Sequence, residues 1–258
     1  MIHHLFSHPY IVIGMHRAGT SMLAGLLHSS GIFMGNDLGK RNEHYESELF
    51  QAINLQLLTQ HGWSWTSPGV PADFSKIRLS TFQLMCGYIK SYRHPRQLLK
   101  LLSGKPWGWK DPRNTFTLPA WLKLFPDARV IHIYRNGMDV ALSLWQRNLK
   151  LAGTKSPRYE KTLESKMAGL DLWEKYTAQA FACEPLLGER MLTVQFEKII
   201  ACDAEEVGKL ERFTGASLRQ QIQSTADPSR QSRFADGQHE NLISYARKSC
   251  WMNKLGYL

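Results

Sequence analysis

The chain has 258 residues, 32 Lys and Arg against 22 Asp and Glu, and a formal net charge of +10. This length is typical of one α/β domain, so we expect residues 1–258 to form a single domain with residues 1–8 as a flexible N-terminal tail. No apolar run is long enough to cross a membrane, and the chain begins without a cationic and apolar leader. These features argue against membrane insertion and predict a cytoplasmic protein.

The positive charge predicts anionic partners without identifying them. Because the basic residues are dispersed and no nucleic-acid-binding signature is present, nucleic acid is not an expected partner. The four cysteines lie far apart without a CxxC pair, and the histidines near the start have no further ligands at metal-binding spacing. We therefore expect neither a disulfide framework nor a bound metal.

Apolar runs and helical periodicity alternate along the chain. They predict strands at residues 10–13, 107–110, 129–134 and 190–194, helices at 21–29, 46–60, 137–147, 167–182 and 205–213, and loops at 63–71 and 152–157. This alternation indicates a parallel sheet with helices on both faces. The expected fold is a P-loop-like three-layer αβα domain with a central sheet of about four to five strands.

The first predicted strand ends in a loop bracketed by two glycines, within PYIVIGMHRAGTS at residues 9–21. Gly14 and Gly19 have the spacing of a phosphate-binding P-loop, but Thr20 stands where that loop carries its lysine. Glycines at both positions permit positive φ and let backbone N–H groups approach anionic oxygens. Arg17 adds a cation, and the helix that follows Thr20 presents its N-terminus to the same place. The pattern favours a phosphorylated ligand other than a nucleoside triphosphate over an ordinary tight turn.

Cationic residues also follow the second and third predicted strands. Lys110, Asp111 and Arg113 end the second strand, and Arg135 follows the third, with Ser143 eight residues later. In open parallel sheets, ligands bind at the carboxyl ends of the strands, so these side chains are expected to meet in one crevice. Arg135 and Ser143 then form a second anion site apart from the glycine loop. Two such sites suggest a nucleotide phosphorylated on its ribose as well as at its 5′ end.

Three stretches of the chain resemble bacterial sulfotransferases that use 3′-phosphoadenosine-5′-phosphosulfate (PAPS). They read HRAGTS at 16–21, WGWKDPRNTFTLPAWLKLFPDARVIHIYRNGMDVALSL at 107–144, and VQFEKII and LERFTG within 194–215. The resemblance covers most of residues 9–215, and residues 216–258 match less well. It implies an enzyme that transfers the sulfuryl group of PAPS to a hydroxyl or amine, with no metal and with 3′,5′-diphosphoadenosine (PAP) as the spent cofactor.

The same resemblance implies the residues that hold PAPS. Those expected at the 5′-phosphosulfate are Arg17, Ala18, Gly19, Thr20 and Ser21, and those expected at the 3′-phosphate are Arg135 and Ser143. More distant members of the superfamily use a late basic loop as well. Arg230 and Arg233 lie in the corresponding part of this chain, which lacks the RKG-like triplet of those members.

Transfer to a hydroxyl also needs a base for the acceptor proton and a cation for the developing charge. The segment NEHYESELF at 42–50 resembles the element that carries the base in the family, which makes Glu46 the first candidate and His44 and Glu43 the next. Alternatively, Glu46 is only an acid in the first turn of a helix. Lys110 is the candidate cation near the bridging oxygen, unless it forms a structural ion pair with Asp111. Asp111 itself is an alternative base with a mainly structural role expected.

Two other functions fit the glycine loop. A P-loop kinase or NTPase that has lost its lysine would need a magnesium-binding acid after a strand, a role open to Asp111. A protein that holds an anionic nucleotide without catalysis is the other reading. The acceptor is expected to be a small molecule or glycan, with Trp63, Trp65 and residues 151–164 as possible cleft residues. The sequence does not determine the acceptor or the oligomeric state.

Overall fold

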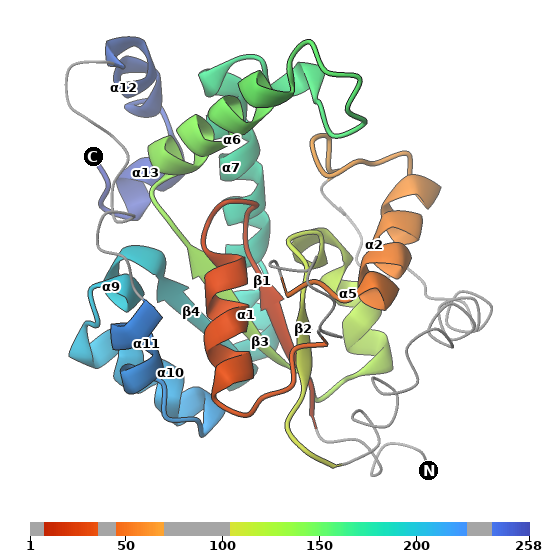
Figure 1. The fold of residues 1–258 in the computed structure, drawn as a ribbon, viewed down its shortest axis with the longest axis vertical. Helices are drawn as coiled ribbons and strands as arrows, with labels where there is room; N and C mark the ends of the chain where they lie inside the picture. The colour runs from red at the N-terminus through yellow and green to blue at the C-terminus, as the bar shows by residue number, and fades with distance from the viewer. Residues whose placement is uncertain (1–7, 36–44, 70–103, 226–238) are drawn as a thin grey trace.

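The computed structural model of the chain describes residues 8–35, 45–69, 104–225 and 239–258 (Figure 1). Its elements, in chain order, are β1 (Tyr10–Ile13), α1 (Thr20–Ser29), α2 (Glu48–Gln60), β2 (Gly108–Lys110), α5 (Asn114–Leu124), β3 (Arg129–Tyr134), α6 (Gly137–Leu151), η2 (Lys161–Leu163), α7 (Lys166–Phe181), α8 (Glu184–Leu187), η3 (Gly188–Arg190), β4 (Met191–Gln195), α9 (Phe196–Ile200), α10 (Ala204–Thr214), α11 (Arg219–Thr225), α12 (Glu240–Ala246) and α13 (Cys250–Lys254).

The four strands form one parallel sheet in the order β2-β1-β3-β4. Tyr10 of β1 pairs with Gly108 of β2 on one side and with Arg129 of β3 on the other, and Val130 of β3 pairs with Met191 of β4. All four carboxyl ends therefore meet at one edge of the sheet. The structure confirms the predicted parallel sheet flanked by helices.

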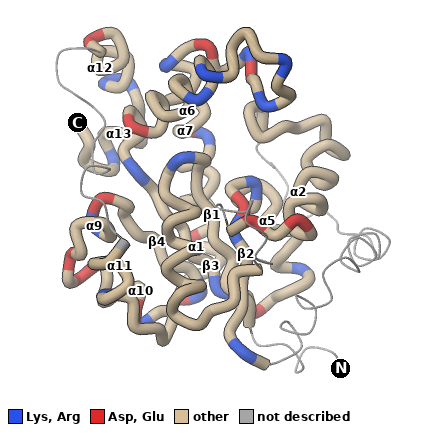
Figure 2. Tube along the Cα trace, in the orientation of Figure 1, with Lys and Arg blue, Asp and Glu red and all other residues tan. Residues whose placement is uncertain are grey.

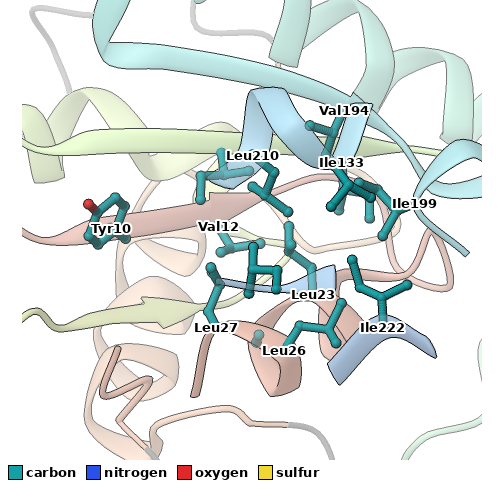
Figure 3. Packing of buried hydrophobic residues seen from close by; sticks show 14 of the residues in the cluster. Tyr10, Val12, Leu23, Leu26, Leu27, Ile133, Val194, Ile199, Leu210 and Ile222 are labelled. Atoms are coloured by element: carbon teal, nitrogen blue, oxygen red, sulfur yellow. The ribbon is translucent and has the colours of Figure 1, made fainter. Parts of the chain in front are cut away.

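Alternate residues of the central strand β1 pack into different hydrophobic clusters, as expected when both faces of a sheet are covered. Tyr10 and Val12 belong to one cluster with side chains of α1 and α10, including Leu23, Leu27 and Leu210 (Figure 3). Ile11 and Ile13 pack in a second cluster with residues of α2 and α5. Burying both faces of β1 fixes the start of the glycine loop that follows it.

The helices α6 and α7 pack together in a third hydrophobic cluster next to the end of β3. Gly137 at the start of α6 would place a Cβ 2.7 Å from the Trp173 ring, so only glycine permits this approach. The Trp173 Nε1–H donates to the carbonyl oxygen of Arg135 at 3.1 Å. The Asn136 side chain caps α6 by accepting from the Met138 amide at 2.9 Å. These contacts fix the backbone at the point where Arg135 leaves the sheet.

Some element bounds differ from the predictions. α2 begins at Glu48 instead of Glu46, because the extended Ser47 occupies the N-cap position. α6 continues to Leu151 instead of ending near Arg147, since Asn148 is held by hydrogen bonds to the backbone of Glu160. Among the described residues, no helix is both long and apolar enough to cross a membrane.

Candidate functional site

A cleft of about 550 Å³ lies at the carboxyl ends of the strands. Its walls include a residue at or just after each strand: Arg17 after β1, Lys110 in β2, Arg135 after β3 and Phe196 after β4. Its cationic lining residues are Arg17, Lys110, Arg113, Arg135, Arg147 and Arg158, and Glu46 is the acid among the lining residues. The expected crevice is present, and its positive charge suits an anionic ligand.

The loop from Gly14 to Gly19 has the backbone conformation predicted from its glycines. Gly14 has φ 138° and Gly19 has φ 97°, and Arg17 also lies in the left-handed region with φ 72°. A Cβ on Gly14 would lie 2.4 Å from the carbonyl oxygen of Ile133, and one on Gly19 would lie 2.3 Å from the Phe196 ring. Both positions therefore require glycine for space as well as for φ.

The loop leads directly into α1, whose first residues line the cleft. Thr20 and Ser21 begin this helix, so their amides belong to the first turn, where backbone N–H groups have no partner within the helix. The Ala18 amide instead donates to the carbonyl oxygen of Met15 at 3.1 Å, and Ala18 is fully buried. The anion-binding potential of this loop comes from the helix N-terminus and the Arg17 side chain.

Arg135 and Ser143 line the same cleft from the end of β3 and the second turn of α6. Arg135 is only 6% exposed, forms an ion pair with Asp139 at 3.4 Å and stacks over the Phe196 ring at 4.5 Å. The Ser143 Oγ accepts a hydrogen bond from Arg17 Nε at 2.9 Å. This bond connects a residue predicted for the 5′-phosphosulfate, Arg17, with one predicted for the 3′-phosphate, Ser143.

Lys110 lines the cleft from the end of β2 and is 1% exposed. Its Nζ is 2.5 Å from Glu46 Oε1 and 3.3 Å from Ser21 Oγ, and the second oxygen of Glu46 accepts from Gln51 Nε2. Burial lowers the pKa of Lys110, and the charge of Glu46 opposes that effect. An acid and a buried cation therefore face each other beside the N-terminus of α1.

The predicted alternative of an ion pair between Lys110 and Asp111 is wrong. Asp111 instead binds Arg113, whose Nε lies 2.9 Å from Oδ1, and accepts from Asn54 Nδ2 at 2.9 Å. Asp111 is fully buried, and burial raises its pKa while Arg113 opposes the shift. Its carboxylate supports the floor of the cleft without lining it.

His16 and Trp65 form one wall of the cleft, with ring centroids 4.5 Å apart. Tyr176 donates its hydroxyl hydrogen to the Trp65 carbonyl oxygen at 2.9 Å. Burial, followed by the charge of Arg113, holds the pKa of His16 well below its usual value, so its imidazole is neutral. Among the described residues, His16 Nε2 has no hydrogen-bond partner.

Most of the predicted site residues line this one cleft: Arg17, Gly19, Thr20, Ser21, Glu46, Lys110, Arg135 and Ser143. His44, Arg230 and Arg233 lie outside the described residues. The sequence reasoning missed His16, Phe196 and Arg147, whereas Arg158 lies within residues 151–164, which were expected as cleft residues. Two signals were available, because Phe196 lies two residues after the end of a predicted strand and Arg147 lies one helical turn after Ser143.

A parallel sheet with a glycine-bracketed anion loop at a helix N-terminus defines a P-loop-like α/β protein. A profile described as the sulfotransferase family matches residues 9–220. The chain therefore belongs to the sulfotransferase family.

Solved sulfotransferase structures share this fold. The sulfotransferase STF9 from Mycobacterium avium is 15% identical with a TM-score of 0.54, covering 96% of this chain and 77% of that one. The sulfotransferase domain from the curacin biosynthetic pathway is 13% identical with a TM-score of 0.52, covering 93% and 96%. The sulfotransferase from Alicyclobacillus acidocaldarius is 14% identical with a TM-score of 0.52, covering 94% and 93%. No curated protein matches the chain in sequence.

Proposed function

We propose that this sulfotransferase uses PAPS as its donor and transfers the sulfuryl group to a hydroxyl of a small molecule or glycan. The observation that supports the proposal is that the residues predicted for the two phosphates line one cleft, where Arg17 Nε donates to Ser143 Oγ at 2.9 Å. A nucleotide with a 3′-phosphate and a 5′-phosphosulfate carries one anion for each of these two groups of residues.

The donor would lie across the edge of the sheet. The 5′-phosphosulfate would bind at the N-terminus of α1, where the Thr20 and Ser21 amides and the Arg17 guanidinium can meet its oxygens. The 3′-phosphate would bind Arg135 and Ser143, whose buried positions strengthen a charge-assisted hydrogen bond. Displacement of Arg17 from Ser143 would free both groups for the phosphates.

In the proposed reaction, Glu46 accepts the proton of the acceptor hydroxyl. The acceptor oxygen forms a bond to sulfur while the bond from sulfur to the bridging oxygen breaks, and that electron pair stays on the 5′-phosphate of PAP. Lys110, 2.5 Å from Glu46 and 3.3 Å from Ser21 Oγ, would then stabilise charge on the bridging oxygen. The charge of Lys110 near Glu46 also holds the carboxylate in place before the acceptor binds.

A kinase or NTPase that uses the same loop is the main rival. A ligand raises the thermal stability of the folded state that it binds, so melting can be compared with PAP and with ATP plus magnesium. The proposal predicts a larger shift with PAP. Transfer of ³⁵S from labelled PAPS to a panel of hydroxyl compounds would then establish the reaction. Stabilisation by ATP plus magnesium alone, or binding of PAP without transfer to any acceptor, would contradict it.

A further inference from the structure

The cleft contains a second pair of cations that the proposed donor does not use. Arg147 lies four residues after Ser143 on α6, so it is about 6 Å farther than Ser143 along the helix axis, in the direction away from Arg135. Arg158, in the connection after α6, lines the same cleft. Figure 2 shows basic residues along α6 and the connection that follows it.

These two guanidinium groups are close enough to affect each other. Burial and then the charge of Arg158 lower the pKa of Arg147, although an arginine remains protonated in proteins. Within the part of the chain that the structure describes, neither side chain forms an ion pair. Glu160 partly compensates the charge of Arg147, but its Oε1 accepts from Trp65 Nε1 at 3.0 Å. Two neighbouring cations, of which Arg147 alone is partly compensated by an acid, favour an added anion.

The backbone near this pair is held in place by two partly buried hydrogen bonds. The Glu160 amide donates to Asn148 Oδ1 at 2.9 Å, and Asn148 Nδ2 donates to the Glu160 carbonyl oxygen at 2.9 Å. This pair of hydrogen bonds connects the segment that carries Arg158 to α6. The Arg147 guanidinium lies over the Trp65 ring at 5.7 Å. Arg147 is half-buried and Arg158 is exposed, so both guanidinium groups are accessible to an anion in the cleft.

We propose that Arg147 and Arg158 bind an anionic group on the acceptor, so that the enzyme sulfates a hydroxyl compound that already carries a carboxylate, phosphate or sulfate. This inference rests on the proposed function, because that function assigns the two donor phosphates to the α1 loop and to Arg135. The wall made by Trp65 and His16 would contact the apolar or sugar face of the same acceptor.

Matched ligand pairs test this proposal on the PAP-saturated protein. The pairs are 4-nitrophenyl β-D-glucuronide with the glucoside, 4-hydroxyphenylacetate with its amide, and glucose 6-phosphate with glucose. Calorimetry should show at least about tenfold tighter binding of the anion in one or more pairs, as expected for a paired, partly buried charge. The pairs also show whether a carboxylate or a phosphate is preferred.

The double variant Arg147→Gln/Arg158→Gln should lose this preference and keep its affinity for PAP. Lys150→Gln, which removes an exposed positive charge from the same helix, is the matched control and should keep both. The proposal is overturned if no pair shows a preference, if the preference survives in the double variant, or if that variant loses PAP affinity. Sulfate transfer without a charge preference would overturn it while leaving the proposed function intact.

Discussion

Replacing Glu46 with glutamine tests the proposed base while preserving the size of the side chain. In the structure, Glu46 is 21% exposed and holds the buried Lys110 at 2.5 Å. Glutamine can still accept one hydrogen bond, but it cannot take the acceptor proton and it leaves the Lys110 charge unbalanced. The change should therefore affect turnover and stability by different amounts.

The magnitudes follow from the environment of the pair. Removing one partner of a fully buried ion pair costs about 3–5 kcal/mol, and the partial exposure of Glu46 reduces this to about 1–3 kcal/mol of unfolding free energy. A positioned general base contributes about 100-fold to 10,000-fold in rate, so kcat should fall by at least about 100-fold. Affinity for PAP should stay the same or increase, because Lys110 becomes available to the donor.

Three measurements separate these effects: urea unfolding, PAP calorimetry and transfer of ³⁵S from PAPS. Glu48→Gln is the matched control, since Glu48 is an exposed acid two residues later that does not line the cleft. Full turnover in Glu46→Gln would remove Glu46 as the base. A parallel loss of PAP affinity and turnover would instead mean that the pair maintains the shape of the cleft.

Three further predictions concern the frame of the site. Gly19→Ala places a Cβ 2.3 Å from the Phe196 ring at φ 97°, so it should abolish measurable PAP binding, and retained affinity would contradict the loop geometry. Asn54→Ala removes hydrogen bonds to four buried side chains. It should lower the free energy of unfolding, measured in urea, by about 3 kcal/mol. A decrease below about 1 kcal/mol would mean that these hydrogen bonds contribute little to stability. Burial lowers the pKa of His132 to about 3, so between pH 7 and pH 5 the imidazole is protonated only in the unfolded state. The free energy of unfolding should therefore fall by about 2 kcal/mol over this range. His132→Asn should remove this contribution and so reduce the slope, while the buried His16 keeps a contribution of its own. The exposed His61→Asn should leave the slope unchanged, and an unchanged slope in His132→Asn would refute the assignment.

Local features of the site could be predicted from the sequence because their geometry is set within a few residues. The spacing of Gly14 and Gly19 specifies a loop with positive φ, and the strand before it and the helix after it specify where that loop points. The position of Arg135 directly after a buried strand likewise places it at the edge of the sheet.

Long-range pairings could not be predicted in the same way. Lys110 was weighed as a partner of Asp111, but successive side chains along a strand point to opposite faces, so the two separate. Lys110 instead reaches Glu46, which is 64 positions earlier and lies just before the extended Ser47 at the N-cap of α2. Phe196 was missed because an aromatic residue after a strand is typical of core, although here its ring also supports Arg135.

The central claim is that the cleft binds a nucleotide with a 3′-phosphate. PAP and 5′-AMP differ only in that phosphate, so calorimetric titration of both compounds tests the claim most directly. We predict that PAP binds at least about tenfold more tightly and that Arg135→Ala removes most of this difference. Arg129→Ala, at the opposite end of the same strand, should keep it. Equal affinity of the wild-type protein for PAP and 5′-AMP would contradict the account.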